Sequence, residues 1–147
     1  MTKRVWEQIV YDEVAGYWDD QEAIARLEQR IRENKEDMLA VKSARADATA
    51  VRGGGNSRED KIIGLLTENE IAQRQIETLA KRIARVRIGL AGLDDQDKDI
   101  LLRMSQASYK DGTVEALCEK YHVEKSQLYR MRSGAAMRYK NAQWGRE

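Results

Sequence analysis

Two stretches of the chain place apolar or small side chains at alternating steps of three and four residues, the a/d pattern of a coiled coil. This pattern predicts two long helices. Between them, residues 43–57 hold three consecutive glycines, which favour a flexible loop. The seam positions are Ile24, Leu27, Ile31, Asn34, Met38 and Val41, then Ile62, Leu65, Asn69, Ala72, Ile76, Leu79, Ile83, Val86, Leu90 and Leu93.

Folding the seams back on each other pairs Val41 with Ile62 at one end and Ile24 with Leu79 at the other. In this antiparallel register Asn34 faces Asn69. A buried Asn pair would fix the register at some cost in stability, whereas two Asn at the edge of a loose seam would be solvated. The pattern leaves both interpretations open. It also leaves open whether the seams close within one chain or between two.

Capping patterns suggest where the helices begin. Asp19 with Glu22 has the pattern of a helix start, which would make 6–17 a separate short helix. Ser57 with Asp60 fits a capping box at the start of the second long helix. We therefore expect three helical segments before residue 93.

The periodicity changes after Leu93. A short amphipathic helix is expected behind a cap at Asp94, and residues 110–112 have the composition of a turn. Thr113 could cap the next helix, which is only two turns long. A third helix is expected from near Glu124 towards Trp144.

The stretch "LCEKYHVEKSQLYRMRS" matches the needs of a helix-turn-helix. Its packing positions hold apolar side chains, and small Cys118 lies where the two helices would approach most closely. His122 occupies the turn position where glycine is usual, and His tolerates positive φ better than most residues. The packing positions are Leu117, Tyr121, Val123, Leu128 and Met131.

The outer face of the third helix is the candidate DNA-reading surface. Between Lys125 and Glu147 the chain has six basic side chains and one acidic side chain, a local excess that suits phosphate contacts. A solvated amphipathic helix end is the alternative. The candidate base-reading residues are Glu124, Lys125, Ser126, Gln127, Tyr129, Arg130 and Ser133, and the candidate phosphate contacts are Lys110, Thr113, Arg132, Arg138 and Lys140.

Composition narrows the function further. The net charge is +1 over 147 residues, so basic character is local rather than general. Proline is absent, which allows long uninterrupted helices, and no apolar run approaches membrane-spanning length. The basic stretch 81–87 is better explained as a solvated helix face than as a nucleic-acid or polymerase contact.

No catalytic constellation is visible. The single His and single Cys lie four residues apart, and no spacing of carboxylates completes a metal site around them. Cys118 falls at a packing position, and the three glycines at 53–55 lack a following Lys-Ser/Thr pair. We therefore expect a protein that is not an enzyme, with no catalytic residues, no metal and no cofactor.

Residues 93–139 resemble region 4 of bacterial sigma-70 factors, with Leu117, Cys118, Val123, Leu128 and Ala135 at its apolar and small positions. The helical first part, the "TAVRGGGNSRED" linker and this module together resemble phage late transcription regulators of the RinA/ArpU type. The resemblance implies a phage or prophage DNA-binding protein that activates late genes. Outside the helix-turn-helix it rests on layout.

These observations predict an all-α protein with a long N-terminal helical hairpin, an antiparallel coiled coil, at 1–92 and a helix-turn-helix domain at 93–147. The expected function is transcription regulation by binding double-stranded DNA, as a homodimer, in the cytoplasm of a bacterial host and without a membrane. Host RNA polymerase is a further candidate partner. Two alternatives are a phage small-terminase-like packaging subunit and a polymerase-binding protein that does not read DNA.

Overall fold

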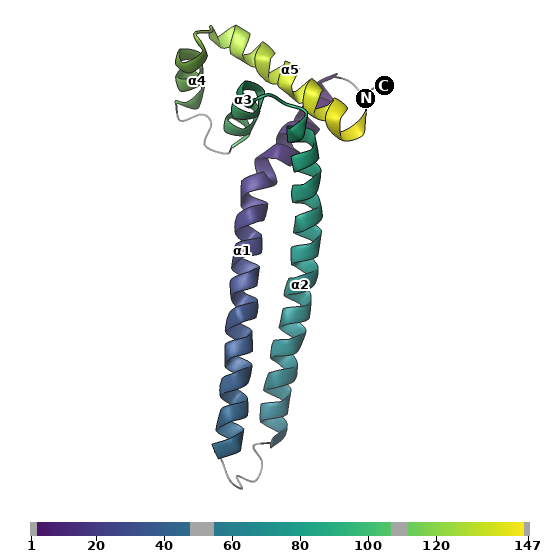
Figure 1. Ribbon diagram of the computed structural model, residues 1–147, viewed down its shortest axis with the longest axis vertical. Coiled ribbons are helices and arrows are strands. Elements are labelled where there is room, and N and C mark those ends of the chain that lie inside the picture. Colours follow the sequence, from purple (N-terminus) through teal and green to yellow (C-terminus); the bar gives the residue numbers. More distant parts are fainter. Residues whose placement is uncertain (1–2, 48–54, 107–111, 146–147) are drawn as a thin grey trace. The chain divides into compact units, whose positions relative to one another are not determined.

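The computed structural model describes residues 3–47, 55–106 and 112–145, and every regular element in these ranges is an α-helix. The predicted all-α class is confirmed. The helices are α1 (Lys3–Asp47), α2 (Gly55–Ala91), α3 (Asp95–Ser105), α4 (Thr113–Tyr121) and α5 (Lys125–Trp144) (Figure 1). None of these helices, over the described ranges, combines the length and apolar character that crossing a bilayer requires.

The chain divides into two compact units, which the two long helices share. One unit, the hairpin unit, is Gln21–Lys81. The other, the head unit, joins residues 1–20 with 82–147. The predicted boundary between 92 and 93 coincides with neither, because the beginning of α1 and the end of α2 share a core with α3 and α5.

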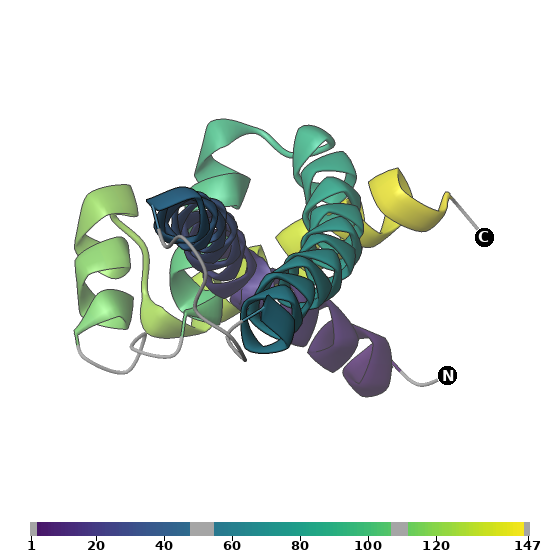
Figure 2. The same cartoon turned by 90° about the horizontal axis from the view of Figure 1, so that it is seen from below.

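In the hairpin unit, α1 and α2 run side by side in opposite directions, as Figure 1 shows along their length and Figure 2 shows end-on. Each predicted seam position from Ile24 to Val41 and from Ile62 to Leu79 is buried or half-buried. Asn34, only 1% exposed, donates from Nδ2 to Oδ1 of Asn69 at 2.8 Å. The predicted register is confirmed, with Asn34 buried and Asn69 half-buried in the shared layer, and the seam closes within one chain.

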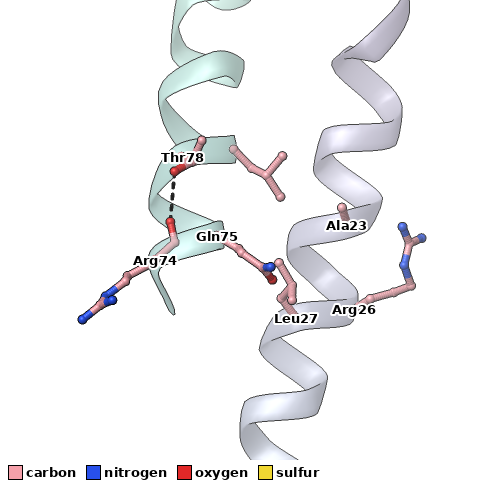
Figure 3. Close-up of a pocket in the computed structure, with 7 residues that line it drawn as sticks. Ala23, Arg26, Leu27, Arg74, Gln75 and Thr78 are labelled. Atoms are coloured by element: carbon pink, nitrogen blue, oxygen red, sulfur yellow. Dashed lines mark hydrogen bonds between the residues drawn. The ribbon is translucent and has the colours of Figure 1, made fainter. Parts of the chain in front are cut away.

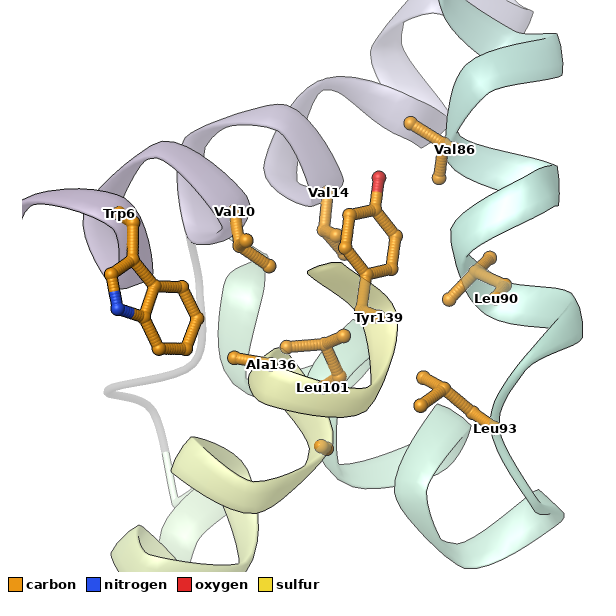
Figure 4. Close-up of a cluster of buried hydrophobic side chains, with 10 residues drawn as sticks. Trp6, Val10, Val14, Val86, Leu90, Leu93, Leu101, Ala136 and Tyr139 are labelled. Carbon is orange, nitrogen blue, oxygen red and sulfur yellow. The ribbon is translucent and has the colours of Figure 1, made fainter. Parts of the chain in front are cut away.

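The head unit has a core built from both ends of the chain (Figure 4). Tyr139 of α5 is fully buried among side chains of α1, α2 and α3. Its ring lies directly against Gly89, where any Cβ would overlap it. The absence of a side chain at Gly89 therefore lets α5 approach α2. The remaining core residues are Trp6, Val10, Val14, Val86, Leu90, Leu93, Leu101, Ala135 and Ala136.

Two expected helix starts are wrong. Helix α1 is continuous through Asp19, so residues 6–17 are not a separate helix. Helix α2 begins at Gly55, which places Ser57 inside its first turn. The helices extend to Asp47 and from Gly55, so the connection is shorter than the predicted loop at 43–57; its residues 48–54 lie outside the described ranges.

The caps of the short helices give a mixed result. The Asp94 carboxylate accepts a hydrogen bond from the backbone N–H of Asp97 at 2.8 Å, so the predicted cap of α3 is confirmed. The N-cap of α4 is Gly112, in the left-handed region at φ 83°, and no side chain caps that helix. Thr113 is thus the first helical residue, and its expected capping role is wrong.

Candidate nucleic-acid interface

A small apolar core fixes the angle between α4 and α5. Leu117 and Leu128 are fully buried, together with Ile100 and Met104 of α3 and Val114. The partly buried side chains around them are Cys118, Tyr121, Val123 and Met131. Every packing position that the sequence suggested for a helix-turn-helix therefore lies in this one cluster.

The turn between α4 and α5 has the backbone that the pattern requires. His122 adopts the left-handed region at φ 56° and ψ 47°, the one non-glycine residue with positive φ in the described ranges. The backbone N–H of Val123 donates to the carbonyl of Cys118 at 3.1 Å, which closes the end of α4. Helix α5 then begins at Lys125, after Glu124 in extended conformation.

Packing Leu128 inward turns the opposite side of α5 to solvent. Six of the seven candidate base-reading residues are exposed, and Ser133 is half-buried. Lys125, Gln127 and Arg130 have no ion pair or side-chain hydrogen bond within the described part of the chain. Their polar groups are therefore available to an external partner.

A shallow depression follows this outer face along α5. Tyr129, Arg130 and Ser133 line it together with Gly134 and Met137, two residues that no sequence motif indicated. Met137 is 38% exposed, so part of its apolar side chain reaches solvent. Steps of four and three residues from Arg130 lead to both positions, so helical spacing alone could have found them.

Arg132, a candidate phosphate contact, is held inside the head unit. Its guanidinium carbon lies 4.2 Å from the ring centroid of Tyr11 and 5.2 Å from that of Tyr129. Stacking between two aromatic rings stabilises a guanidinium and fixes its direction. This contact orients Tyr129 on the candidate surface, and a phosphate would have to share Arg132 with both rings.

Two further candidate phosphate contacts also have partners within the chain. Arg138 Nε donates to Oδ2 of Asp97 at 2.6 Å, and the Asp97 side chain is only 10% exposed. That hydrogen bond raises the pKa of Arg138 above its ordinary value. Lys140 Nζ lies 5.4 Å from the ring centroid of Trp6. Both side chains link α5 to other helices of its unit.

The remaining two candidate phosphate contacts lie before α4 and at its start. Lys110 falls outside the described residues. Thr113 is half-buried at the N-terminus of α4, where free backbone N–H groups favour an anion.

A carboxylate holds α3 against α4. Asp99 accepts hydrogen bonds from Lys120 Nζ at 2.7 Å and from the Tyr121 hydroxyl at 2.5 Å, and Arg103 lies 3.9 Å away. Burial alone would raise the pKa of Asp99, but the two hydrogen bonds outweigh it and the pKa lies below its usual range. Asp99 therefore stays ionised and restrains Lys120.

The basic stretch 81–87 is partly engaged within the head unit. Arg82 lies 3.2 Å from the Asp20 carboxylate, and Arg87 Nε donates to the Tyr17 hydroxyl at 3.3 Å. These contacts join the two long helices, so the two side chains already have a structural role.

The hairpin unit carries an open groove on one flank, lined by Ala23, Arg26, Leu27, Arg74, Gln75, Thr78 and Leu79 (Figure 3). The Thr78 hydroxyl donates a hydrogen bond to the backbone carbonyl of Arg74 at 3.1 Å. Among the described side chains, no three His, Cys, Asp or Glu gather closely enough to hold a metal ion. The outer face of α5, exposed beside the apolar cluster that packs α4 against α5, remains the candidate nucleic-acid interface.

Comparisons with known proteins add no relative. No protein-family model, curated protein or solved structure matches this chain.

Proposed function

We propose that this protein is a transcription regulator that reads double-stranded DNA with α5. The observation that carries the proposal is the helix-turn-helix itself. One apolar cluster fixes α4 and α5, the left-handed turn lies at His122, and the polar face of α5 points to solvent. A helix held in this way can enter a major groove with its first turns leading.

The side chains on that face divide the work between bases and backbone. Arg130 is exposed one turn into α5, and an arginine there can grip guanine O6 and N7 with two hydrogen bonds. Gln127 and Lys125 flank it and reach either a base edge or a phosphate. Met137, further along the face, would offer an apolar contact to a thymine methyl.

The resemblance to sigma region 4 and to RinA/ArpU-type regulators supplies the biological setting of the proposal. It favours a phage or prophage regulator of late genes, acting in the cytoplasm of a bacterial host, with host RNA polymerase as a further partner.

Selection of bound sequences from a random DNA pool tests the proposal. The parent protein should enrich a defined site. Arg130→Ala should lose roughly 1–3 kcal/mol of binding free energy on that site and relax the preference at one base pair. Arg74→Ala, which removes an exposed arginine from the hairpin unit, is the matched control and should keep both affinity and site.

The outcomes separate the alternatives. No enrichment by the parent, with and without RNA polymerase, would overturn DNA reading. Enrichment with an unchanged base preference in Arg130→Ala would keep DNA binding but remove Arg130 from base recognition. A protein that binds polymerase but enriches no site would be an interaction protein.

A further inference from the structure

The hairpin unit exposes large apolar side chains on one flank near its closed end. Leu39 is 64% exposed, Ile63 60% and Leu66 49%. In the confirmed register Leu39 and Ile63 occupy heptad position b, and Leu66 occupies position e. Each of the three directly follows a seam residue in the sequence. Positions b and e face one side of a coiled coil, just as a and d face the partner helix. A chain that used only its internal seam would place polar residues there.

Charged residues continue this flank in an ordered way. Over 32–39 and 63–70, the b and e positions of α1 are Arg32, Lys35 and Leu39, and those of α2 are Ile63, Leu66 and Glu70. We call these six residues the second stripe. Its α1 half is basic at one end, and its α2 half is acidic at the corresponding end.

The charged side chains of the second stripe form no ion pair within the described part of the chain. Over the described residues neither Lys35 nor Glu70 forms an ion pair, and Arg32 donates only to its neighbour Gln29 at 2.7 Å. On the opposite flank, by contrast, Arg30 pairs with Glu68 across the hairpin at 2.6 Å. One flank is thus closed by internal electrostatics, while the other presents complementary groups outward.

The register shows which groups share a level. Because Asn34 pairs with Asn69, Met38 lies opposite Leu65, so Leu39 is level with the interval between Ile63 and Leu66. By the same count, Glu70 is level with the interval between Arg32 and Lys35. Each residue of the α1 half therefore has its chemical complement at the same height on the α2 half.

We propose that the second stripe binds the second stripe of another copy of this chain, with a two-fold axis along the hairpin. Such an axis places α1 of one copy over α2 of the other at the same level. Leu39 then packs against Ile63 and Leu66 of the second copy, and Arg32 and Lys35 meet its Glu70. A two-fold axis across the hairpin would instead set α1 against α1 and juxtapose like charges.

The result is a four-helix arrangement in which two internal seams are joined by two identical intermolecular contacts. This proposal stands independently of DNA binding, since it uses residues of the hairpin unit alone.

Disulfide trapping in the full chain tests the pairing. The single native cysteine is first replaced, Cys118→Ala, and Leu39→Cys and Ile63→Cys are made in separate chains of different tagged mass. Mixed and oxidised, the two chains should yield the cross-linked heterodimer, while each chain alone should yield much less covalent dimer. Ile71→Cys, 51% exposed on the other flank, is the control and should link with neither.

A charge swap tests the same geometry without cysteine. Arg32→Glu with Lys35→Glu, and separately Glu70→Lys, should each weaken self-association by about tenfold or more because like charges then face each other at both contacts. Mixing the two variants should restore the dimer as a heterodimer, since both contacts regain opposite charges. Arg26→Glu, on the other flank, should leave self-association unchanged.

Sedimentation equilibrium, with helicity checked by circular dichroism, measures the association in each mixture. A parent that stays monomeric at high micromolar concentration would overturn the proposal. So would a dimer that Leu39→Cys traps with itself as readily as with Ile63→Cys, or a charge swap that fails to restore association.

Discussion

Replacing Asn69 with Leu should destabilise the hairpin unit more than replacing Asn34 with Leu. The two amides share one hydrogen bond at 2.8 Å, but their surroundings differ: Asn34 is 1% exposed, whereas Asn69 is half-buried. Whichever residue remains loses its partner. When Asn34 is replaced, the remaining Asn69 can hydrogen-bond to water instead. When Asn69 is replaced, the buried Asn34 cannot reach water.

The magnitudes follow from that asymmetry. A buried polar group left without its partner costs about 1–3 kcal/mol. Burial of the new leucine side chain stabilises the fold by about 1 kcal/mol at the half-buried position 69. At the fully buried position 34 the same burial contributes about 1.5–3 kcal/mol. We therefore expect Asn69→Leu to lower the free energy of unfolding by about 1 kcal/mol and Asn34→Leu to raise it by up to about 1 kcal/mol.

The double variant should be more stable than the parent by about 2 kcal/mol, because it buries two leucines and strands no amide. The cycle then gives a coupling free energy of about 1–3 kcal/mol. Urea unfolding followed by circular dichroism measures all four proteins. Gln29→Leu, on the exposed outer face of α1, is the control and should stay within about 0.5 kcal/mol of the parent.

A coupling free energy within about 0.5 kcal/mol of zero would contradict the shared buried layer. Equal effects of the two single substitutions would contradict the difference in burial. The double variant should also lose some specificity of register, and additional oligomeric species in sedimentation would show this loss.

Two further predictions concern the helices of the head and hairpin units. Gly89→Ala should lower the free energy of unfolding by about 1–3 kcal/mol, because its Cβ would overlap the Tyr139 ring. Gly64→Ala has open space around it and should raise the free energy of unfolding by up to about 1 kcal/mol. Melting temperatures that shift in the same direction for both variants would refute this contrast. Arg138→Ala should lower the free energy of unfolding by about 1–3 kcal/mol, because it leaves the Asp97 carboxylate without its partner. Arg130 is also exposed but has no such partner among the described residues, so Arg130→Ala should leave the melting temperature nearly unchanged. Equal melting temperatures of the two variants would show that Arg138 has no structural role.

Periodicity by itself determined the two long helices and the antiparallel register of their seams, whereas closure of the seams within one chain came from the structure. A seam of steps of three and four faces one direction on a helix, and two such seams that each hold one Asn have one alignment that pairs the two amides. The helix-turn-helix was equally predictable, because its packing positions and its left-handed turn residue lie within one short segment. Local spacing was sufficient in both cases.

The tertiary structure alone decided what the two ends of the chain do together. Trp6, Val10 and Val14 belong to the core around Tyr139, a contact between segments far apart in sequence that no local period encodes. The same packing gives Arg132 and Arg138 partners, Tyr11 and Asp97, that lie on other helices. Residue type alone marked these arginines as candidate phosphate contacts. A positive charge on a helix does not reveal which distant side chain will contact it, so their partners within the chain could not be predicted. Burial and partners depend on how helices cross, and only the folded chain fixes that.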